Sequence, residues 1–589
     1  MSKEKRFLIT TALEDSWVDD QPALFLGEWC RMYTLKDKWL RMDAVVLSYH
    51  WDQSDKLNSD YKYLNDLYER ILIDLVSLLN NIHKVNHSAK YWRVLIGPWI
   101  AVLAHVLYDR WLSIQNAQDS FEITGTIALD VNKDNLVAND MEEFDFIIGT
   151  DEWNHNIFLE IINTLNLCQV TLHGKSEEKY KPLKVKSKLH IKSKILEIYS
   201  KVVSYFPKNQ NFFLIDTYLS KFDELLLQFK LGQFPKFWSN EDPFQYSLNK
   251  ELRNWEIQSP AQNPFEEFLL RIIPQQIPKV VMEGYKQLVD QADNLSWPES
   301  PKLIYTSNVL WFQSVSMAYT AEKMENGAKL YYGQHGGGYG VSGFSFAEDH
   351  ERRIADKYLT FGWSDKSESS VKPIGMSNIN NIRLKNFNDN KRLLLITLNA
   401  SRYSFRLGSE TTRNFIDYFE DYFSFTSFLD DQVRSNMMIR LHSWDMGWNQ
   451  NLRWIDNFPN IKLDLGVQEI QKLMIGSRLV VHTYNSTGIL QTLALGVPSI
   501  LFYDLKSMPL REEAIPYFNE LKKVGIFHTN VESAAVHVDE IWEDVDLWWN
   551  SYEVKAAVTN FNNQYCYQSD NITNSIKNII QENSNGQLP

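Results

Sequence analysis

The stretch RLVVHTYNSTGILQTLALGVPSILFYD, residues 478–504, decides the fold class. It opens with a short apolar run typical of a strand, continues with the helical pattern STGILQTLALG, and ends in the strand-like run VPSILFYD. A strand, a helix and a second strand in this order form the unit from which parallel sheets are built. We therefore predict a parallel sheet in this part of the chain.

The same alternation continues on the N-terminal side of this stretch. Strand-like runs at 391–399 and 436–442 alternate with helical patterns at 413–429 and 468–477. Residues 391–589 are therefore predicted to form a doubly wound, nucleotide-binding Rossmann-like domain, in which the segment after about residue 511 is helical.

The earlier part of the chain has a different texture. A strand is expected near residues 5–14 and a strand–helix–strand unit at 301–338, and helical patterns dominate between them. Residues 1–365 are predicted to form an N-terminal domain on the acceptor and sugar side, joined by a polar linker at 366–390. The predicted class is α/β, with two Rossmann-type domains facing a cleft and a large helical elaboration of the N-terminal half.

Composition argues against several kinds of partner. The net charge is −14 and the sequence has no lysine- or arginine-rich block, which argues against a nucleic-acid partner. The three cysteines have no metal-ligand spacing, so no metal site is expected. The apolar segment 94–108 is bracketed by charges and is short for a bilayer span, so we expect a buried helix in a cytoplasmic protein. Aromatic residues make up 13% of the chain, which suits sugar faces and leaves peripheral contact with the inner membrane open.

Polar residues follow the predicted strands of the C-terminal half. Because ligands of open parallel sheets bind at the carboxyl ends of the strands, these residues are expected to converge on one crevice. Hydroxyl residues at a helix N-terminus offer donors and the positive end of the helix dipole, which together make a phosphate seat. The candidate nucleotide-binding residues are Ser401, Arg402, Arg440, His442, Asn485, Ser486, Thr487 and Gly488, with Asn399 and Ser443 beside them.

Each of these residues also has an ordinary structural interpretation. Ser486 and Thr487 suit a simple helix cap, Arg440 a surface ion pair, and His442 a satisfied histidine at a strand end. Convergence of three loops on one cleft favours an anion over three coincidences. The chain has no GxxxxGK[ST] pattern, and its C-terminal half has no GxGxxG pattern, which argues against a Walker-type NTPase and a dinucleotide site.

A glycine-rich loop, KLYYGQHGGGYG at residues 329–340, ends the last clear strand of the first half. Glycine lets the backbone approach a ligand closely, and the loop has no lysine to grip a triphosphate, so we expect it to line a sugar or acceptor pocket. The residues assigned to that pocket are Gln334, Gly336, Gly337 and Gly338. His335 is the candidate for proton exchange with a hydroxyl, because the pKa of histidine is near neutral.

Two acidic residues follow this loop. Glu348 and Glu351 have helical spacing on one face, where a nucleophile or general base could lie. The alternatives are a glycine-rich turn with a structural histidine and a solvated helix face. For a retaining mechanism through a carboxylate nucleophile, Glu14 and Asp15 are further candidates.

Several of these motifs resemble those of known enzymes. The two-domain arrangement resembles the GT-B glycosyltransferases, and IRLHSW and HTYNSTG look like the motifs that sialyltransferases place on a CMP phosphate, although Ser443 replaces their usual proline. FLGEWC, YWRVLIGPWI and GQHGGGYG are similar to a transferase family from bacterial O-antigen and surface-polysaccharide gene clusters. The resemblance implies a nucleotide-sugar donor, CMP-linked sialic acid, another nonulosonate or Kdo, and a glycan or lipid-linked glycan acceptor, without a further cofactor.

Two alternatives to a CMP-sugar transferase stay open. GQHG is similar to the WHG of CDP-glycerol glycerophosphotransferases, in which a histidine is the base, but Gln334 replaces the tryptophan. A non-catalytic partner in polysaccharide assembly would keep the fold without the chemistry. The sequence does not distinguish inversion from retention.

Overall fold

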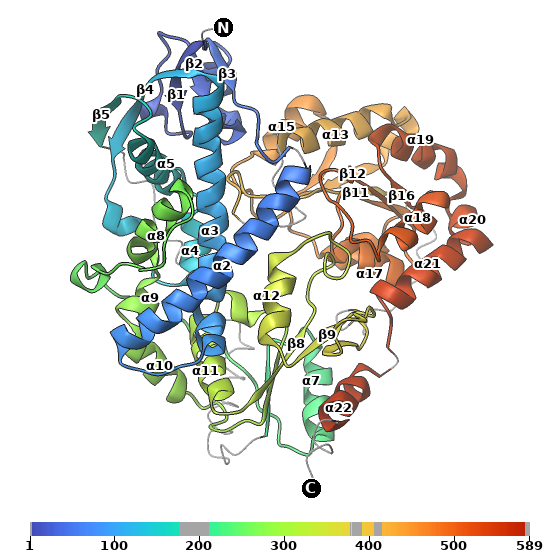
Figure 1. Ribbon diagram of the computed structural model, residues 1–589. Helices are drawn as coiled ribbons and strands as arrows, with labels where there is room; N and C mark the ends of the chain where they lie inside the picture. The colour runs from blue at the N-terminus through green and yellow to red at the C-terminus, as the bar shows by residue number, and fades with distance from the viewer. Residues whose placement is uncertain are drawn as a thin grey trace.

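The computed structural model describes residues 3–52, 54–175, 211–376, 379, 391–405, 415–569 and 571–582. Three sheets, each with parallel pairing throughout, follow one another along the chain (Figure 1). The predicted α/β class is confirmed. The presence of a separate first sheet differs from the sequence analysis, which expected mainly helix beyond the opening strand.

The first sheet has the strand order β3-β2-β1-β4-β5. Its strands are β1 (Lys5–Ile9), β2 (Ala23–Phe25), β3 (Ala44–Val46), β4 (Glu122–Asp130) and β5 (Val170–Lys175). Two of these strands are only three residues long, and the two longest helices of the region separate β3 from β4. Strands of three residues are too short for a recognisable alternation, which explains why β2 and β3 were missed. Length does not explain why the nine-residue β4 and the six-residue β5 were missed.

The long helix α3 (Ala89–Ser120) runs from the first sheet to the region of the second, and α2 (Ser54–His83) packs against it (Figure 1). The other helices of this part of the chain are α1 (Lys36–Trp39), α4 (Met141–Ile147), α5 (Asp151–Leu165), α7 (Lys221–Lys230), α8 (Pro264–Gln276), α9 (Lys279–Met282) and α10 (Tyr285–Asp293). By length and composition α3 could cross a membrane, but 89% of its most apolar window is buried inside the protein. The predicted buried helix is confirmed and is longer than the apolar segment 94–108.

The second sheet has the order β10-β9-β8-β7-β6. Its elements are β6 (Phe212–Ile215), β7 (Leu303–Thr306), α11 (Ser314–Glu325), β8 (Lys329–Gly333), α12 (Phe346–Ile354), β9 (Lys357–Thr360) and β10 (Val371–Pro373). The predicted strand–helix–strand unit is therefore confirmed. β10 falls inside the predicted linker 366–390, so the start of that segment belongs to the sheet; residues 377–378 and 380–390 lie outside the described residues.

The third sheet has the order β13-β12-β11-β14-β15-β16, which is a doubly wound topology. Its strands are β11 (Leu393–Ile396), β12 (Met437–Arg440), β13 (Lys462–Asp464), β14 (Leu479–His482), β15 (Ser499–Phe502) and β16 (Phe527–His528). The helices are α13 (Phe415–Phe428), α14 (Asp431–Ser435), α15 (Gln450–Asn457), α16 (Ile470–Ile475), α17 (Thr487–Leu495), α18 (Ile515–Lys523), α19 (Val531–Ile541), α20 (Val545–Trp549) and α21 (Tyr552–Tyr565).

The last described helix, α22 (Ile572–Glu582), does not pack on the third sheet. Its buried isoleucines, Ile572, Ile576 and Ile580, share a core cluster with Leu214 of β6 and Leu227 of α7. Figure 1 shows α22 beside α7 at the second-sheet end of the molecule. The segment 391–589, which was predicted as one C-terminal domain, therefore includes a helix that packs beside the second sheet.

A candidate active site between the second and third sheets

A cavity of about 760 Å³ lies between the second and third sheets. It is lined by the glycine loop, the start of α12 and the loops after β11, β12 and β14, so the predicted cleft between two Rossmann-like units is confirmed. Its lining residues are His335–Tyr339, Ser342, Ser345–Ala347, Ile396–Ala400, Phe405, Arg440–Ser443, Met446, Ile470, Tyr484, Ser486 and Thr487. None of these described lining residues is acidic, whereas Arg440, His335 and His442 supply basic groups.

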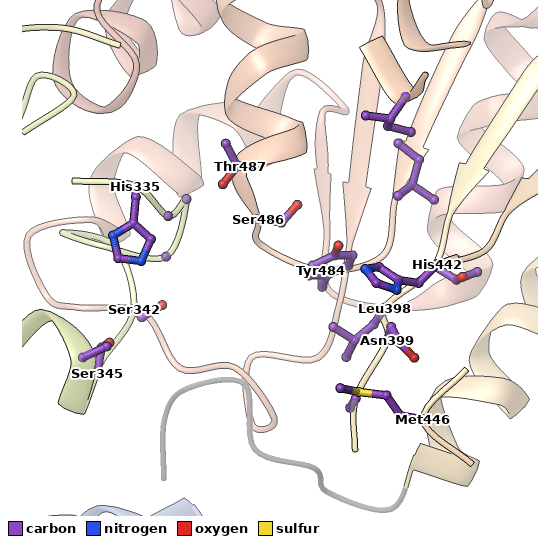
Figure 2. A pocket seen from close by; sticks show the side chains of 18 of the residues that line it. His335, Ser342, Ser345, Leu398, Asn399, His442, Met446, Tyr484, Ser486 and Thr487 are labelled. Atoms are coloured by element: carbon purple, nitrogen blue, oxygen red, sulfur yellow. The ribbon is translucent and has the colours of Figure 1, made fainter. Parts of the chain in front are cut away.

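The N-terminus of α17 forms one wall of the cavity. Ser486 is the helix cap, and its Oγ accepts a hydrogen bond from the Gly488 N–H at 3.2 Å. Both Ser486 and Thr487 line the cavity, in Figure 2 between His335 on one side and His442 and Tyr484 on the other. Capping and ligand binding are therefore compatible here, since the cap leaves the positive end of the helix directed at the cavity. Asn485 is buried and, like Gly488, does not line the cavity.

Arg440 and His442 reach the cavity from the end of β12. The Arg440 guanidinium is ion-paired with Asp464 and donates to the Gln468 carbonyl at 2.8 Å. Asp464 is almost fully buried, so it fixes the arginine and compensates part of its charge. His442 is exposed in the cavity, and its Nδ1 lies 3.2 Å from the Trp444 nitrogen and 3.3 Å from the Trp444 carbonyl oxygen. A histidine ring can donate to a ligand or accept from it, according to its tautomer.

Arg402 does not line the cavity, contrary to the phosphate-binding position predicted for it. It is buried, ion-paired with Asp151 at the start of α5, and donates to the Trp29 carbonyl at 2.9 Å. Tyr403 donates to the same Asp151 at 2.6 Å, and burial raises the pKa of Tyr403 well above its usual value. The loop after β11 thus divides: Asn399 faces the cavity, whereas Arg402 anchors the loop to the first sheet.

Ser401 belongs to the anchored part of that loop. It is nearly buried, its Oγ lies beside Gly149 of the first-sheet region, and it does not line the cavity. Strand-end position alone predicted both residues for the crevice, but the docking of the first sheet onto this loop decides their direction.

The glycine loop touches the N-terminus of α17 directly. A Cβ on Gly337 would lie 2.2 Å from the Ser486 carbonyl carbon and 2.3 Å from the Thr487 nitrogen, so only glycine fits. Gly340 is a second position that requires glycine, because its φ is +74° and an added Cβ would lie 2.5 Å from the Trp363 ring. The close approach brings His335 next to the predicted phosphate seat.

Gln334 holds the loop rather than facing the cavity. Its side chain donates to the Gly336 carbonyl at 2.8 Å and accepts from Phe361 N and Trp363 Nε1, both at 2.9 Å. It is 2% exposed and does not line the cavity, unlike Gly336, Gly337 and Gly338. The structure therefore gives Gln334 a structural position instead of the predicted ligand contact.

His335 lies in the cavity wall with Glu351 behind it. Its Nε2 is 3.2 Å from the Tyr339 hydroxyl, and its Nδ1 is 3.7 Å from Glu351 Oε1. Glu351 also accepts from the hydroxyls of Tyr339 and Tyr358, both at 3.1 Å. Because Glu351 is 1% exposed and does not line the cavity, it is placed to stabilise a protonated His335 and not to attack a substrate.

Glu348 lies on the same helix face but has different partners. It accepts from Gly340 N at 2.9 Å and forms ion pairs with Arg352 at 3.1 Å and Arg511 at 3.0 Å. It is fully buried and does not line the cavity, so the predicted nucleophile or base at this position is instead a structural ion pair.

Glu14 and Asp15, the other carboxylates considered for retention, form part of a 3₁₀ turn after β1. Glu14 pairs with Lys38 at 3.2 Å, and neither residue lines the cavity. Glu14, Asp15, Glu348 and Glu351, the four carboxylates considered as nucleophile or base, are therefore all absent from the described residues that line the cavity.

Sequence reasoning missed three residues that organise this site. Tyr339 stands inside the glycine loop and bridges His335 and Glu351. Asp464 ends the strand next to β12 in the sheet, so the strand-end rule that selected Arg440 would also have selected its partner. Asp151 gave no local signal, because its partner Arg402 is 251 residues away.

Comparison with solved structures gives distant likenesses. A variant of wall teichoic acid polymerase TagF soaked with CDPG is 12% identical over 67% of this chain and 92% of that chain, with a TM-score of 0.35. Anabaena HepE in complex with UDP and glucose is 13% identical over 55% and 90%, with a TM-score of 0.32. Phytolacca americana UGT2 complexed with UDP-2fluoro-glucose and pterostilbene is 10% identical over 53% and 81%, with a TM-score of 0.30.

No curated protein matches the sequence. At the level of families, residues 6–580 match the LIC12162 family transferase, which covers nearly the whole chain, including all three sheets and the cavity between the last two. The chain therefore belongs to the LIC12162 family of transferases.

Proposed function

We propose that this transferase moves a sugar from a nucleotide-activated donor to an acceptor hydroxyl, and that the donor is a CMP-linked nonulosonate or Kdo. One observation carries the proposal: the N-terminus of α17 and His335 border the same cavity, with Gly337 packed against the Ser486 backbone. A phosphate leaving group needs a seat for its charge, and the acceptor hydroxyl needs a base close by. The cavity offers one of each.

The charges of the lining support an anionic donor. The phosphate of the donor would lie on the N-terminus of α17, where Ser486 and Thr487 supply hydroxyl and backbone donors. A CMP-linked acid sugar carries a carboxylate close to the phosphate and so has two anionic groups to accommodate. The basic residues Arg440 and His442, and the absence of an acidic group among the described lining residues, suit such a donor.

The proton step is assigned to His335. As the acceptor oxygen bonds to the anomeric carbon, the bond from that carbon to the phosphate oxygen breaks and the hydroxyl proton passes to Nε2 of His335, the ring nitrogen that is not directed at Glu351. CMP departs with the bonding electrons and is stabilised at α17. Glu351 faces the imidazolium from the protein side, 3.7 Å from Nδ1, and lowers the free energy of that charged state. A single displacement fits this arrangement, since the carboxylate candidates do not line the cavity.

The biological setting belongs to the same proposal. The resemblance to transferases of O-antigen and surface-polysaccharide gene clusters supports a glycan or lipid-linked glycan acceptor at the cytoplasmic side of the inner membrane. The alternative donor is CDP-glycerol, because a histidine on a glycine loop next to a phosphate seat also suits transfer of glycerol phosphate.

Release of the nucleotide tests the donor. The protein is incubated separately with CMP-linked nonulosonate, CMP-Kdo and CDP-glycerol, each with a lipid-linked glycan extract, and CMP is quantified. CMP release from a CMP-sugar that is lost in His335→Ala supports the proposal. Release only from CDP-glycerol assigns the alternative, and release from none of the three while CMP fails to bind in calorimetry overturns nucleotide-dependent transfer in favour of a non-catalytic role.

A further inference from the structure

Next to His335 the second sheet carries a feature that the donor site does not use. β6 ends at Ile215, and the following loop runs through Asp216, Thr217 and Tyr218. Because the order of the strands is β8-β7-β6 and all are parallel, this loop lies on the same carboxyl edge as the glycine loop, two strands away from it. The Tyr218 ring lies 6.0 Å from the His335 ring, centroid to centroid, and 37% of the residue is exposed.

The backbone of this loop is held in an unfavourable conformation. Asp216 has φ +43° and Tyr218 has φ +58°, in the left-handed region where a bulky residue is a genuine outlier. Such a conformation persists only when its surroundings impose it, and it recurs at binding and active sites. Here Ser307 holds the loop in place. Its Oγ donates to the carbonyl of the buried Thr217 at 3.1 Å, and its N–H donates to the Asp216 carbonyl at the same distance.

The two side chains offer complementary polar and apolar groups. The carboxylate of Asp216 is half-buried, and within the described residues no side chain or backbone group donates a hydrogen bond to it. Burial is the main cause that raises the pKa of Asp216. Lys221 lowers this pKa, and Glu224 raises it. Tyr218 presents an aromatic face and a hydroxyl that has no hydrogen-bond partner among the described residues.

We propose that Tyr218 and Asp216 form the acceptor subsite and bind a neutral, hydroxyl-bearing sugar ring beside His335. The ring packs on the face of Tyr218, and Asp216 accepts a hydrogen bond from a sugar hydroxyl. A phosphorylated or carboxylated acceptor does not suit this place, because the carboxylates of Asp216 and Glu351 act on Tyr218. Glu224 adds little to this charge, since it is paired with Lys221 at 2.8 Å. That the bound sugar is the acceptor rests on the proposed function; that a sugar binds here does not.

The strain at Tyr218 allows a variant that separates binding from folding. Glycine adopts the left-handed conformation without cost, so Tyr218→Gly removes the aromatic face and relieves the backbone. The melting temperature of this variant is expected to equal or exceed that of the wild type. Phe222→Ala is the matched control, since Phe222 is an exposed aromatic residue on the following helix turn, with 72% of its surface exposed.

Saturation-transfer NMR with a panel of methyl glycosides of glucose, galactose, mannose and N-acetylglucosamine tests the subsite. We expect at least one of them to bind the wild type and Phe222→Ala equally, and Tyr218→Gly and Asp216→Asn to bind it about threefold to tenfold more weakly. Glycerol 3-phosphate is expected not to bind. Binding of none of the four glycosides, equal binding by Tyr218→Gly, or preference for glycerol 3-phosphate would overturn the subsite.

Calorimetry with CMP on the same variants keeps this outcome apart from the proposed function. Unchanged CMP affinity in Tyr218→Gly is expected, because the phosphate seat lies on the third sheet. If glycosides bind in a Tyr218-dependent manner while the wild type fails to bind CMP, the sugar subsite stands and the proposed donor is wrong.

Discussion

Glu348 and Glu351 lie three residues apart on α12, both are buried, and yet their surroundings differ. Glu348 meets two guanidinium groups and one backbone N–H, so its charge is balanced within the protein. Glu351 meets two tyrosine hydroxyls, and its Oε1 lies 3.7 Å from Nδ1 of His335. The contacts of Glu348 join two parts of the fold, whereas Glu351 places a negative charge beside His335, where it stabilises the protonated ring.

The largest expected effect tests the histidine on which this difference depends. His335→Ala should lower turnover by about 10²–10⁴-fold, the usual contribution of general acid–base catalysis. CMP affinity in calorimetry should stay close to wild type, because the phosphate seat is on the third sheet. A folded His335→Ala protein that turns over at the wild-type rate would remove the proton-transfer role.

The two carboxylates should then separate into a stability effect and an activity effect. Glu348→Gln removes one partner of a buried ion pair, so unfolding free energy should fall by about 3–5 kcal/mol. Glu351→Gln keeps one tyrosine hydrogen bond on its amide oxygen, and its amide N–H can donate to the hydroxyl of the other tyrosine, so it should lose less stability; its turnover should fall between those of wild type and His335→Ala. Urea denaturation and initial rates measure both. Similar losses of stability in the two variants would contradict the comparison.

A parallel contrast holds for the two arginines predicted at the phosphate. Arg440→Ala should weaken CMP binding by about 1.5–3 kcal/mol, as for a charged hydrogen bond, and should also lower the melting temperature, because it leaves the buried Asp464 without its guanidinium. Arg402→Ala should lower the melting temperature through the loss of its pair with Asp151, but should leave CMP affinity unchanged. The readouts are calorimetry with CMP and thermal unfolding. Unchanged CMP affinity in a folded Arg440→Ala protein would limit Arg440 to its ion pair with Asp464.

These contrasts show how far sequence reasoning extends. The strand-end rule places His335, Arg440, His442, Ser486 and Thr487 correctly in one cavity, because it depends only on local alternation and parallel topology. It fails for residues whose direction is set by a distant part of the chain.

Arg402 is such a residue, since Asp151 at the start of α5 turns it away from the cavity. The helical spacing of Glu348 and Glu351 predicts their shared face, but not that Arg511, 163 residues away, pairs with Glu348. In the first sheet, β2 and β3 were missed because strands of three residues leave no periodic signal.

The smallest expected effect concerns the same helix and its response to pH. His350 lies between the two carboxylates, is 1% exposed, and packs against Gly97 of α3, where a Cβ would lie 2.7 Å from its ring. Burial, with smaller contributions from Arg93 and Arg353, lowers the pKa of His350 to about 3. The unfolded chain, with a histidine pKa of about 6.5, therefore binds more protons than the folded protein at mildly acidic pH. The stability from this neutral histidine is complete above pH 6.5 and is lost as pH falls from 6.5 towards 3, by about 1.4 kcal/mol per pH unit.

Urea denaturation at pH 7.5, 6.5 and 5.5 measures this contribution. His350→Gln should reduce the loss of stability between pH 6.5 and 5.5 by about 1 kcal/mol relative to wild type, because glutamine does not titrate. His482 is the matched control on the third sheet: it is also fully buried, and burial lowers its pKa to about 3. His482→Gln should remove a similar part of the pH dependence, but only His350→Gln should alter the α12 contacts that hold Glu351 behind His335. An unchanged pH dependence in His350→Gln would mean that this ring is protonated in the folded protein. The protonated His350 would then be a cation on the same helix as Glu351, and the contrast between Glu351 and Glu348 would no longer hold.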